Sequence, residues 1–146
     1  MEQRIQINQL EPEAQKAMYG LENYLAKSEL SATHIGLIKM RASQINGCAF
    51  CINMHTKEAI KNNETPKRIF LLDAWKESNL FSEEEMVVLS VTEEITLIHK
   101  NGLSKTTYNK ALGIFSENYL AQIIMAATII NAWNRIAIST HKPLQN

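Results

Sequence analysis

The chain has 146 residues, of which 45% are apolar, and its 15 basic and 15 acidic residues leave no net charge. This length and apolar fraction indicate a compact fold and exclude a disordered chain, so we expect one domain over residues 1–146. The balanced charge offers neither the basic surface of a nucleic-acid-binding protein nor an acidic tail.

Helical spacing runs through the whole chain, because apolar residues recur every three or four positions and only five glycines and three prolines interrupt them. The first predicted helix spans residues 11–27 and carries Pro12 in its first turn. Ser31 caps a second helix, which ends at the turn residues Asn46 and Gly47.

Three more helices are predicted in the middle of the chain. The third spans about residues 48–62. The fourth spans about residues 65–75 and begins with a Thr–Pro cap. The fifth spans residues 83–99, and Ser82 with Glu85 forms the capping box that starts it.

The last part of the chain predicts a short helix over about residues 104–114 and a long one over residues 117–137. The long helix is apolar on nearly every side, so it is either the central core helix of one protomer or partly covered by a subunit interface. For Asn131 and Asn134 of this helix, a structural role is predicted rather than a role in a pocket. The tail, residues 139–146, is expected to be loose. The predicted fold class is all-α, a compact domain of six to seven helices.

Neither export nor membrane insertion is indicated by the apolar segments. Residues 1–10 alternate polar and apolar side chains and lack the long apolar run of a signal peptide. The longest apolar stretch, residues 119–130, contains Gln122 and Thr128 and is too short to span a bilayer. We therefore expect a cytoplasmic protein without membrane association. In that reducing compartment a CxxC pair is more often redox-active or metal-binding than structural.

The two cysteines of the chain, Cys48 and Cys51, lie three residues apart, and His55 follows four residues after the second. On a helix these residues and Glu58 share one face. A helix that starts at Cys48 places both thiols where free backbone N–H groups and the helix dipole favour an anion, which lowers a thiol pKa. His55 could stabilise the thiolate or take its proton, and Glu58 could orient the imidazole.

Three other interpretations of the CxxC compete with redox chemistry. Two buried cysteines can be small apolar residues, but the flanking glycine and the histidine argue against this. A structural zinc site needs four ligands, and the second pair that usually completes it is absent from the sequence. Covalent haem needs a histidine directly after the second cysteine, where Ile52 stands. No metal site is expected. Since flavin, haem and nicotinamide signatures are also lacking, no cofactor is expected either.

Four charged residues lie on helices that could approach the thiols. Lys39 and Arg41 lie on the helix that leads to Cys48, and Glu93 and Glu94 lie on the fifth predicted helix. Solvated surface is the favoured interpretation of all four.

The segment from Ile38 to Ala59, which contains the CxxC, resembles the core motif of the alkylhydroperoxidase D-like (AhpD-like) branch of the carboxymuconolactone decarboxylase family. Residues 130–135 are similar to a second segment of this branch, and the resemblance covers about residues 10–138. It implies an all-helical protein that forms trimers or hexamers and reduces hydroperoxides. It also implies that Cys51 is the attacking thiolate, Cys48 the resolving thiol and His55 part of a proton relay.

One position departs from the family pattern. The family's relay commonly includes a glutamate twelve residues before the first cysteine, and Gly36 stands there in this chain. Glu58 is the candidate on the same helix as the cysteines that could replace it.

We therefore expect a thiol-dependent oxidoreductase that reduces hydroperoxides, with catalytic residues Cys48, Cys51 and His55 and a possible relay residue in Glu58. A thioredoxin-like protein or another dithiol would then reduce the Cys48–Cys51 disulfide. Two alternatives stay open at this point. One is a disulfide reductase or adaptor without fast peroxide chemistry, and the other is a cofactor-free decarboxylase-like enzyme in which the cysteines are incidental.

Overall fold

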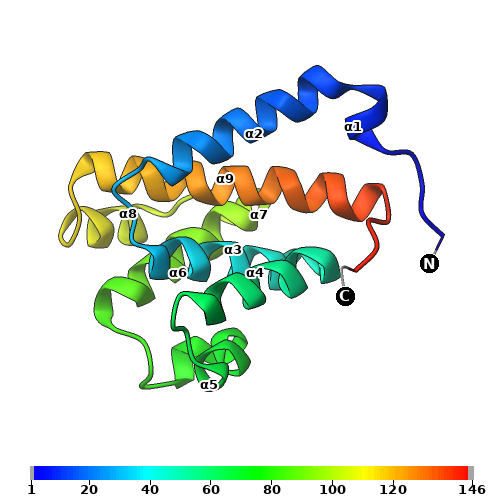
Figure 1. The fold of residues 1–146 in the computed structure, drawn as a ribbon. Coiled ribbons are helices and arrows are strands. Elements are labelled where there is room, and N and C mark those ends of the chain that lie inside the picture. Colours follow the sequence, from blue (N-terminus) through cyan, green and yellow to red (C-terminus); the bar gives the residue numbers. More distant parts are fainter. Residues whose placement is uncertain (1, 145–146) are drawn as a thin grey trace.

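A computed structural model describes residues 2–144, and all regular secondary structure in that part of the chain is helical, which confirms the all-α prediction (Figure 1). None of these helices combines the length and the apolar character needed to cross a membrane. The elements are α1 (Ile7–Leu10), α2 (Pro12–Ala26), α3 (Ala32–Asn46), α4 (Ala49–Lys61), α5 (Pro66–Phe70), η1 (Leu72–Glu77, a 3₁₀ helix), α6 (Glu83–Thr96), α7 (Ile98–Asn101), α8 (Lys105–Leu112) and α9 (Glu117–Ser139).

Local capping chemistry places most helix starts where the sequence predicts them. At five helices the hydroxyl of the N-cap residue accepts the backbone N–H of the third helical residue, which satisfies a donor that the helix itself leaves unpaired. At α6 the Glu85 carboxylate also accepts the Ser82 N–H, so the predicted capping box is present. The five caps are Ser31, Thr65, Ser82, Ser104 and Ser116.

Two predicted helices are broken in the structure. The fourth divides into α5 and the 3₁₀ helix η1, in which Ala74 has non-helical dihedral angles. The three-residue period of a 3₁₀ helix puts Leu72 and Trp75 on one side, and both are buried. The fifth predicted helix stops at Thr96, and α7 follows after Leu97. The four-residue α1 has no counterpart among the predicted helices.

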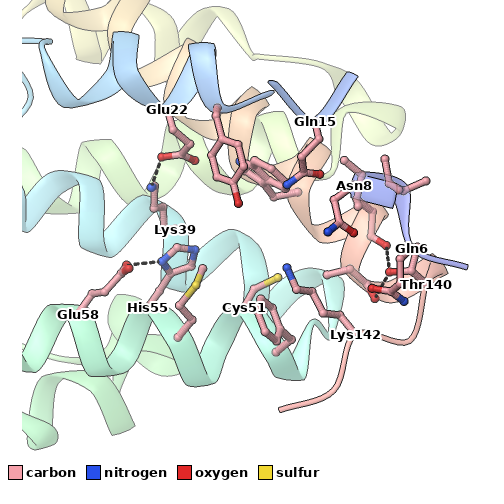
Figure 2. A pocket seen from close by; sticks show the side chains of 17 residues that line it. Gln6, Asn8, Gln15, Glu22, Lys39, Cys51, His55, Glu58, Thr140 and Lys142 are labelled. Carbon is pink, nitrogen blue, oxygen red and sulfur yellow. Dashed lines mark hydrogen bonds and ion pairs between the residues drawn. The ribbon is translucent and has the colours of Figure 1, made fainter. Parts of the chain in front are cut away.

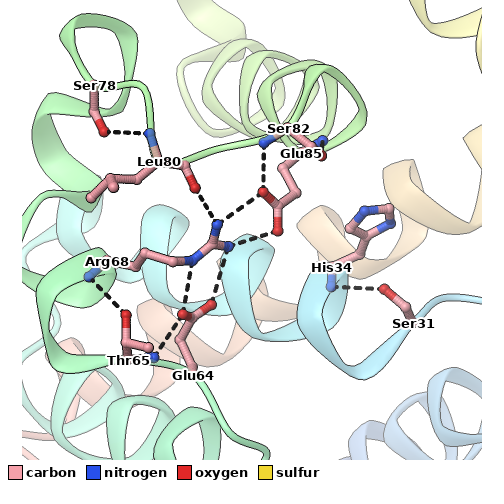
Figure 3. A network of polar contacts seen from close by, with 9 residues as sticks. All are labelled: Ser31, His34, Glu64, Thr65, Arg68, Ser78, Leu80, Ser82 and Glu85. Atoms are coloured by element: carbon pink, nitrogen blue, oxygen red, sulfur yellow. Dashed lines mark hydrogen bonds and ion pairs between the residues drawn. The ribbon is translucent and has the colours of Figure 1, made fainter.

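A guanidinium group ties α5 to the start of α6 (Figure 3). Arg68 Nε donates to Glu64 at 2.8 Å, and Arg68 Nη2 donates to Glu85 at 2.6 Å. Arg68 Nη1 also donates to the carbonyl oxygen of Leu80. Because Glu85 belongs to the α6 capping box, one carboxylate fixes both the α5 contact and the start of α6.

α9 is the central helix, and Figure 1 shows it crossing the molecule between α2 on one side and α3 with α4 on the other. Its buried residues Ile123 and Ile130 join the main core with Leu25 of α2, Ile38 of α3 and Val88 of α6. The neighbours α2, α3, α4, α6 and α8 of the same protomer therefore provide most of the cover that this apolar helix requires.

The expectation of a loose tail is wrong for residues 139–142, and it stays a prediction for Pro143 and Leu144, which are exposed. Ser139 is the last residue of α9, Thr140 is buried, and Lys142 N–H donates to the carbonyl of Ala137. The N-terminal segment runs alongside, since Arg4 N–H donates to Thr140 O at 3.1 Å. These contacts order residues 139–142, and residues 145–146 lie outside the described part of the chain.

Candidate active site

The turn between α3 and α4 sets the position of the cysteine pair. Gly47 has a φ of 69°, a left-handed conformation that ends α3 and that other residues adopt only with strain. Next to it, Asn46 Nδ2 donates to Asn131 Oδ1 at 2.9 Å and to Asn134 Oδ1 at 2.8 Å. The two asparagines of α9 thus have the structural role favoured from the sequence, and they fix the turn against the central helix.

Cys48 is the N-cap of α4, as predicted, and Cys51 lies in its first turn. The two residues form a disulfide with their Cα atoms 5.3 Å apart. Cys51 N–H donates to Cys48 Sγ at 3.3 Å, so a backbone donor of the helix start already points at sulfur. Both residues are at most 2% exposed, but only Cys51 lines the adjacent cavity. The structure therefore distinguishes the two sulfurs, since a small molecule in the cavity meets Cys51.

His55 lies one turn after Cys51, is buried, and lines the same cavity. Its Nδ1 lies 2.7 Å from Glu58 Oε2. An ionised carboxylate only accepts hydrogen bonds, so Nδ1 is the donor and Nε2 is left as the nitrogen that can accept a proton. This hydrogen bond is the main reason that the pKa of Glu58 lies below its ordinary value, against the opposing effect of burial. The orienting role predicted for Glu58 agrees with this contact.

A cavity of about 540 Å³ extends from the Cys51–His55 face of α4 towards α2 and α9 (Figure 2). Its apolar wall includes Phe50 and Met54 of α4 and Trp133 of α9, whose ring lies 5.6 Å from that of Tyr19. At one end the Lys142 Nζ sits 4.6 Å from the centre of the Phe50 ring. The site can therefore hold a small organic molecule against the reactive face of the cysteine pair.

An ion pair in the cavity wall was missed by the sequence analysis. Lys39 Nζ and Glu22 Oε2 lie 2.7 Å apart, and the side chains are 12% and 26% exposed. The interpretation of Lys39 as solvated surface is wrong, because α2 covers it. The position of Lys39, one helical turn after Gly36 on the helix that leads to the cysteines, was a weak indication that it lies near the site. Nothing in the sequence around Glu22 indicated this, because its helix meets the site only through tertiary packing.

The other charged residues considered from the sequence do not line the cavity. Arg41 Nε donates to Glu93 Oε1 at 2.8 Å, and Glu93 also accepts from Trp75 and Lys76. Glu94 accepts from the Ser104 backbone and hydroxyl, at the start of α8. The surface interpretation is thus wrong for Arg41 and Glu93, whose side chains are only 12% and 15% exposed and bind α3 and η1 to α6.

No carboxylate occupies position 36, and a Cβ built on Gly36 would meet only Ala59 Cβ, at 3.8 Å. Within residues 2–144, no cluster of three or more histidine, cysteine, aspartate or glutamate residues could hold a metal ion. The cavity itself is lined by sulfur, imidazole, carboxylate and ammonium groups.

Comparison with known proteins places this site in a family. Residues 12–94 match the sequence pattern of the carboxymuconolactone decarboxylase family. The uncharacterized protein YdfG of Bacillus subtilis is 40% identical over 139 residues, which cover 95% of each chain. A protein of unknown function from Agrobacterium tumefaciens, proposed as the antioxidant defence protein AhpD, has a crystal structure that matches with a TM-score of 0.96 and 36% identity over 99% of both chains.

An uncharacterized peroxidase-related protein from a Silicibacter species matches with a TM-score of 0.77 and covers 86% of this chain and 67% of its own. At 19% identity this likeness shows the fold alone. Together, fold and site define an all-helical protein with a CxxC disulfide at the start of a helix. The chain belongs to the carboxymuconolactone decarboxylase family, and the predicted likeness to its AhpD-like branch is confirmed.

Proposed function

We propose that this protein is a thiol-dependent peroxidase that reduces hydroperoxides through the Cys48–Cys51 pair. One observation carries the proposal: the two cysteines form a disulfide at the N-terminus of α4, with Cys51 and the His55–Glu58 pair facing one cavity. A helix start favours thiolate, and a thiolate is the form of cysteine that attacks a peroxide.

The reaction balances with the two thiols as the reductant. The Cys51 thiolate attacks one peroxide oxygen, the O–O bond breaks, and Cys51 becomes a sulfenic acid. The leaving alkoxide takes a proton and departs as an alcohol, or as water when the substrate is hydrogen peroxide. The Cys48 thiolate then attacks the Cys51 sulfur, and hydroxide leaves with a proton as water while the disulfide forms. Each turnover thus converts one hydroperoxide and two thiols into an alcohol, a water molecule and the disulfide.

The residues around the pair have separate roles in this scheme. Cys51 attacks because it lines the cavity, and Cys48 resolves because it is buried behind it. His55 moves protons through Nε2, while Glu58 holds the ring from Nδ1. A second dithiol must reduce the disulfide, and burial of both sulfurs favours a small dithiol group that enters the cavity over a bulky protein surface.

Stopped-flow oxidation of the reduced protein by an organic hydroperoxide tests the proposal. We expect the wild-type protein to react at least about a hundredfold faster than free cysteine, because thiolate formation and proton transfer both contribute. Cys51→Ser should abolish the reaction. Cys48→Ser should still consume one equivalent of peroxide and stop at the sulfenic acid, which a dimedone probe detects. A wild-type rate no better than that of free cysteine would overturn the proposal and favour the disulfide reductase.

A further inference from the structure

The Glu22–Lys39 ion pair lies inside the candidate active site rather than on the surface. Both residues line the cavity together with Cys51, His55 and Glu58. Figure 2 shows the Lys39 side chain extending from α3 towards the Glu22 carboxylate of α2, on the same side of the cavity as the His55–Glu58 pair. A cation held at 2.7 Å by a carboxylate is therefore a fixed feature of the cavity wall.

The charged and titratable groups that face this cavity come from four parts of the chain. α2 provides Glu22 and the phenol of Tyr19, α3 provides Lys39, α4 provides the His55–Glu58 pair, and the segment after α9 provides Lys142. The residues of α1 and α9 that line the cavity are uncharged. The charge of Lys39 also acts outside its own ion pair. The hydrogen bond from His55 is the main cause of the lowered pKa of Glu58, and the charges of Lys39 and Lys61 lower it further.

Packing of α2 does not depend on this pair, because α2 packs mainly on α9 and α1 rather than on α3. Leu25 of α2 and Ile38 of α3 are each at most 1% exposed and belong to the same apolar core. A partly buried ion pair adds little stability on its own, because desolvation offsets much of the attraction between the charges. Its place in the cavity wall therefore calls for a role other than holding the two helices together.

We propose that Lys39 and Glu22 form a positioning pair that sets the charge balance around Cys51 and His55. This inference rests on the proposed function and adds to it two residues that lie outside α4. The ammonium of Lys39 favours the Cys51 thiolate and keeps Glu58 ionised for its hydrogen bond with His55. The Glu22 carboxylate fixes the ammonium and offsets part of its charge.

The two partners carry opposite charges, so their removal should move thiolate formation in opposite directions. In a reduced Cys48→Ser background, ultraviolet absorbance reports the Cys51 thiolate as pH is raised. We expect Lys39→Met to raise the midpoint pH by on the order of one unit, because a cation that lines the same cavity as the thiolate is lost. Glu22→Gln should lower the midpoint, because an anion is lost while Lys39 stays charged. The double variant should return close to the midpoint of its background.

Matched controls separate charge from folding. The exposed pair of Lys16 and Glu13, also on α2, is 3.7 Å apart, and Lys16→Met and Glu13→Gln should leave the midpoint unchanged. Lys39→Arg keeps the charge and should hold the midpoint near that of the background, which tests the inference even if Lys39→Met is unstable. Midpoints that stay fixed, or that move the same way in both single variants, would overturn the inference. Because the titration needs no peroxide, its outcome is independent of whether the protein is a peroxidase.

Discussion

The hydrogen bond from His55 to Glu58 links the stability of the protein to pH. The pKa of Glu58 is lowered from its ordinary 4.5 in the folded protein, mainly by this bond. A lowered folded pKa stabilises the folded state above the unfolded pKa, and this contribution disappears as pH falls through the folded value. The Glu58 side chain is 55% exposed, so solvent screens the effect.

We therefore expect Glu58→Gln to lower the free energy of unfolding by roughly 0.5 kcal/mol at neutral pH and by progressively less below about pH 4.5. Thermal unfolding of both proteins between pH 3 and pH 7 measures this difference. Glu13→Gln, which removes an exposed carboxylate, serves as the control. If Glu58→Gln lowered the free energy of unfolding by the same amount at every pH in this range, the stabilising role of the ionised Glu58 would be contradicted.

Asn134 is the buried residue on which the α3–α4 turn depends most directly. It is 0% exposed, accepts from Asn46 at 2.8 Å and donates to Ser43 Oγ at 3.0 Å. Asn134→Ala leaves these buried polar groups short of partners, so we expect a loss of about 2–3 kcal/mol in the free energy of unfolding. Urea unfolding measures the loss. Asn118→Ala, which breaks only an exposed contact to Glu29, should stay within about 0.5 kcal/mol of wild type.

Among the helices, α3 contains a glycine in its interior that sterics do not require. The Cβ of an alanine at position 36 would make an ordinary contact with Ala59 and meet nothing closer. We expect Gly36→Ala to stabilise the protein by about 0.5–1 kcal/mol, since glycine loses more backbone entropy in a helix than alanine does. At Gly47, where φ is 69°, the same substitution should destabilise by about 1 kcal/mol. Chemical denaturation measures the free energy of unfolding of the two variants. Changes of the same sign in both would contradict this prediction.

The elements that the sequence predicts well are those fixed by local chemistry. Ser82 with Glu85 starts α6, Gly47 ends α3, and Cys48 caps α4, because each feature needs only residues a few positions away. The break of the fourth helix was missed because burial of Leu72 and Trp75 against other helices decides it.

The same distinction applies within the candidate site. Cys48, Cys51, His55 and Glu58 belong to one helix and its N-cap, so their spacing in the chain was sufficient to predict that they lie together. Glu22 enters from a helix that is separate in sequence, and no local pattern marks such a residue.

Burial of α9 within the protomer removes the reason that the sequence offered for self-association. The apolar surface that suggested a subunit interface is largely buried by five other helices of the protomer. The trimer or hexamer implied by the family stays a prediction, and light scattering after size-exclusion chromatography measures it against the 16.6 kDa protomer. Phe70, which is 81% exposed beside Leu71, is a large apolar side chain that the protomer leaves uncovered.

The two ends of the chain together close one side of the cavity. Gln6, Ile7 and Asn8 line it, and the segment that carries them is fastened by the hydrogen bond from Arg4 N–H to Thr140 O. Cys51, which lines the same cavity, is 2% exposed, so we expect the N-terminal segment to limit access to it.

Deletion of residues 1–10 should therefore increase the rate at which iodoacetamide alkylates Cys51 in the reduced Cys48→Ser protein by severalfold. The deletion leaves α4 and its caps in place, so the midpoint of thiolate formation should change little, and titrating the truncated protein separates access from ionisation. Mass spectrometry of the alkylated peptide measures the rate at Cys51. Equal alkylation rates at equal thiolate fractions would show that the N-terminal segment does not control entry to the cavity.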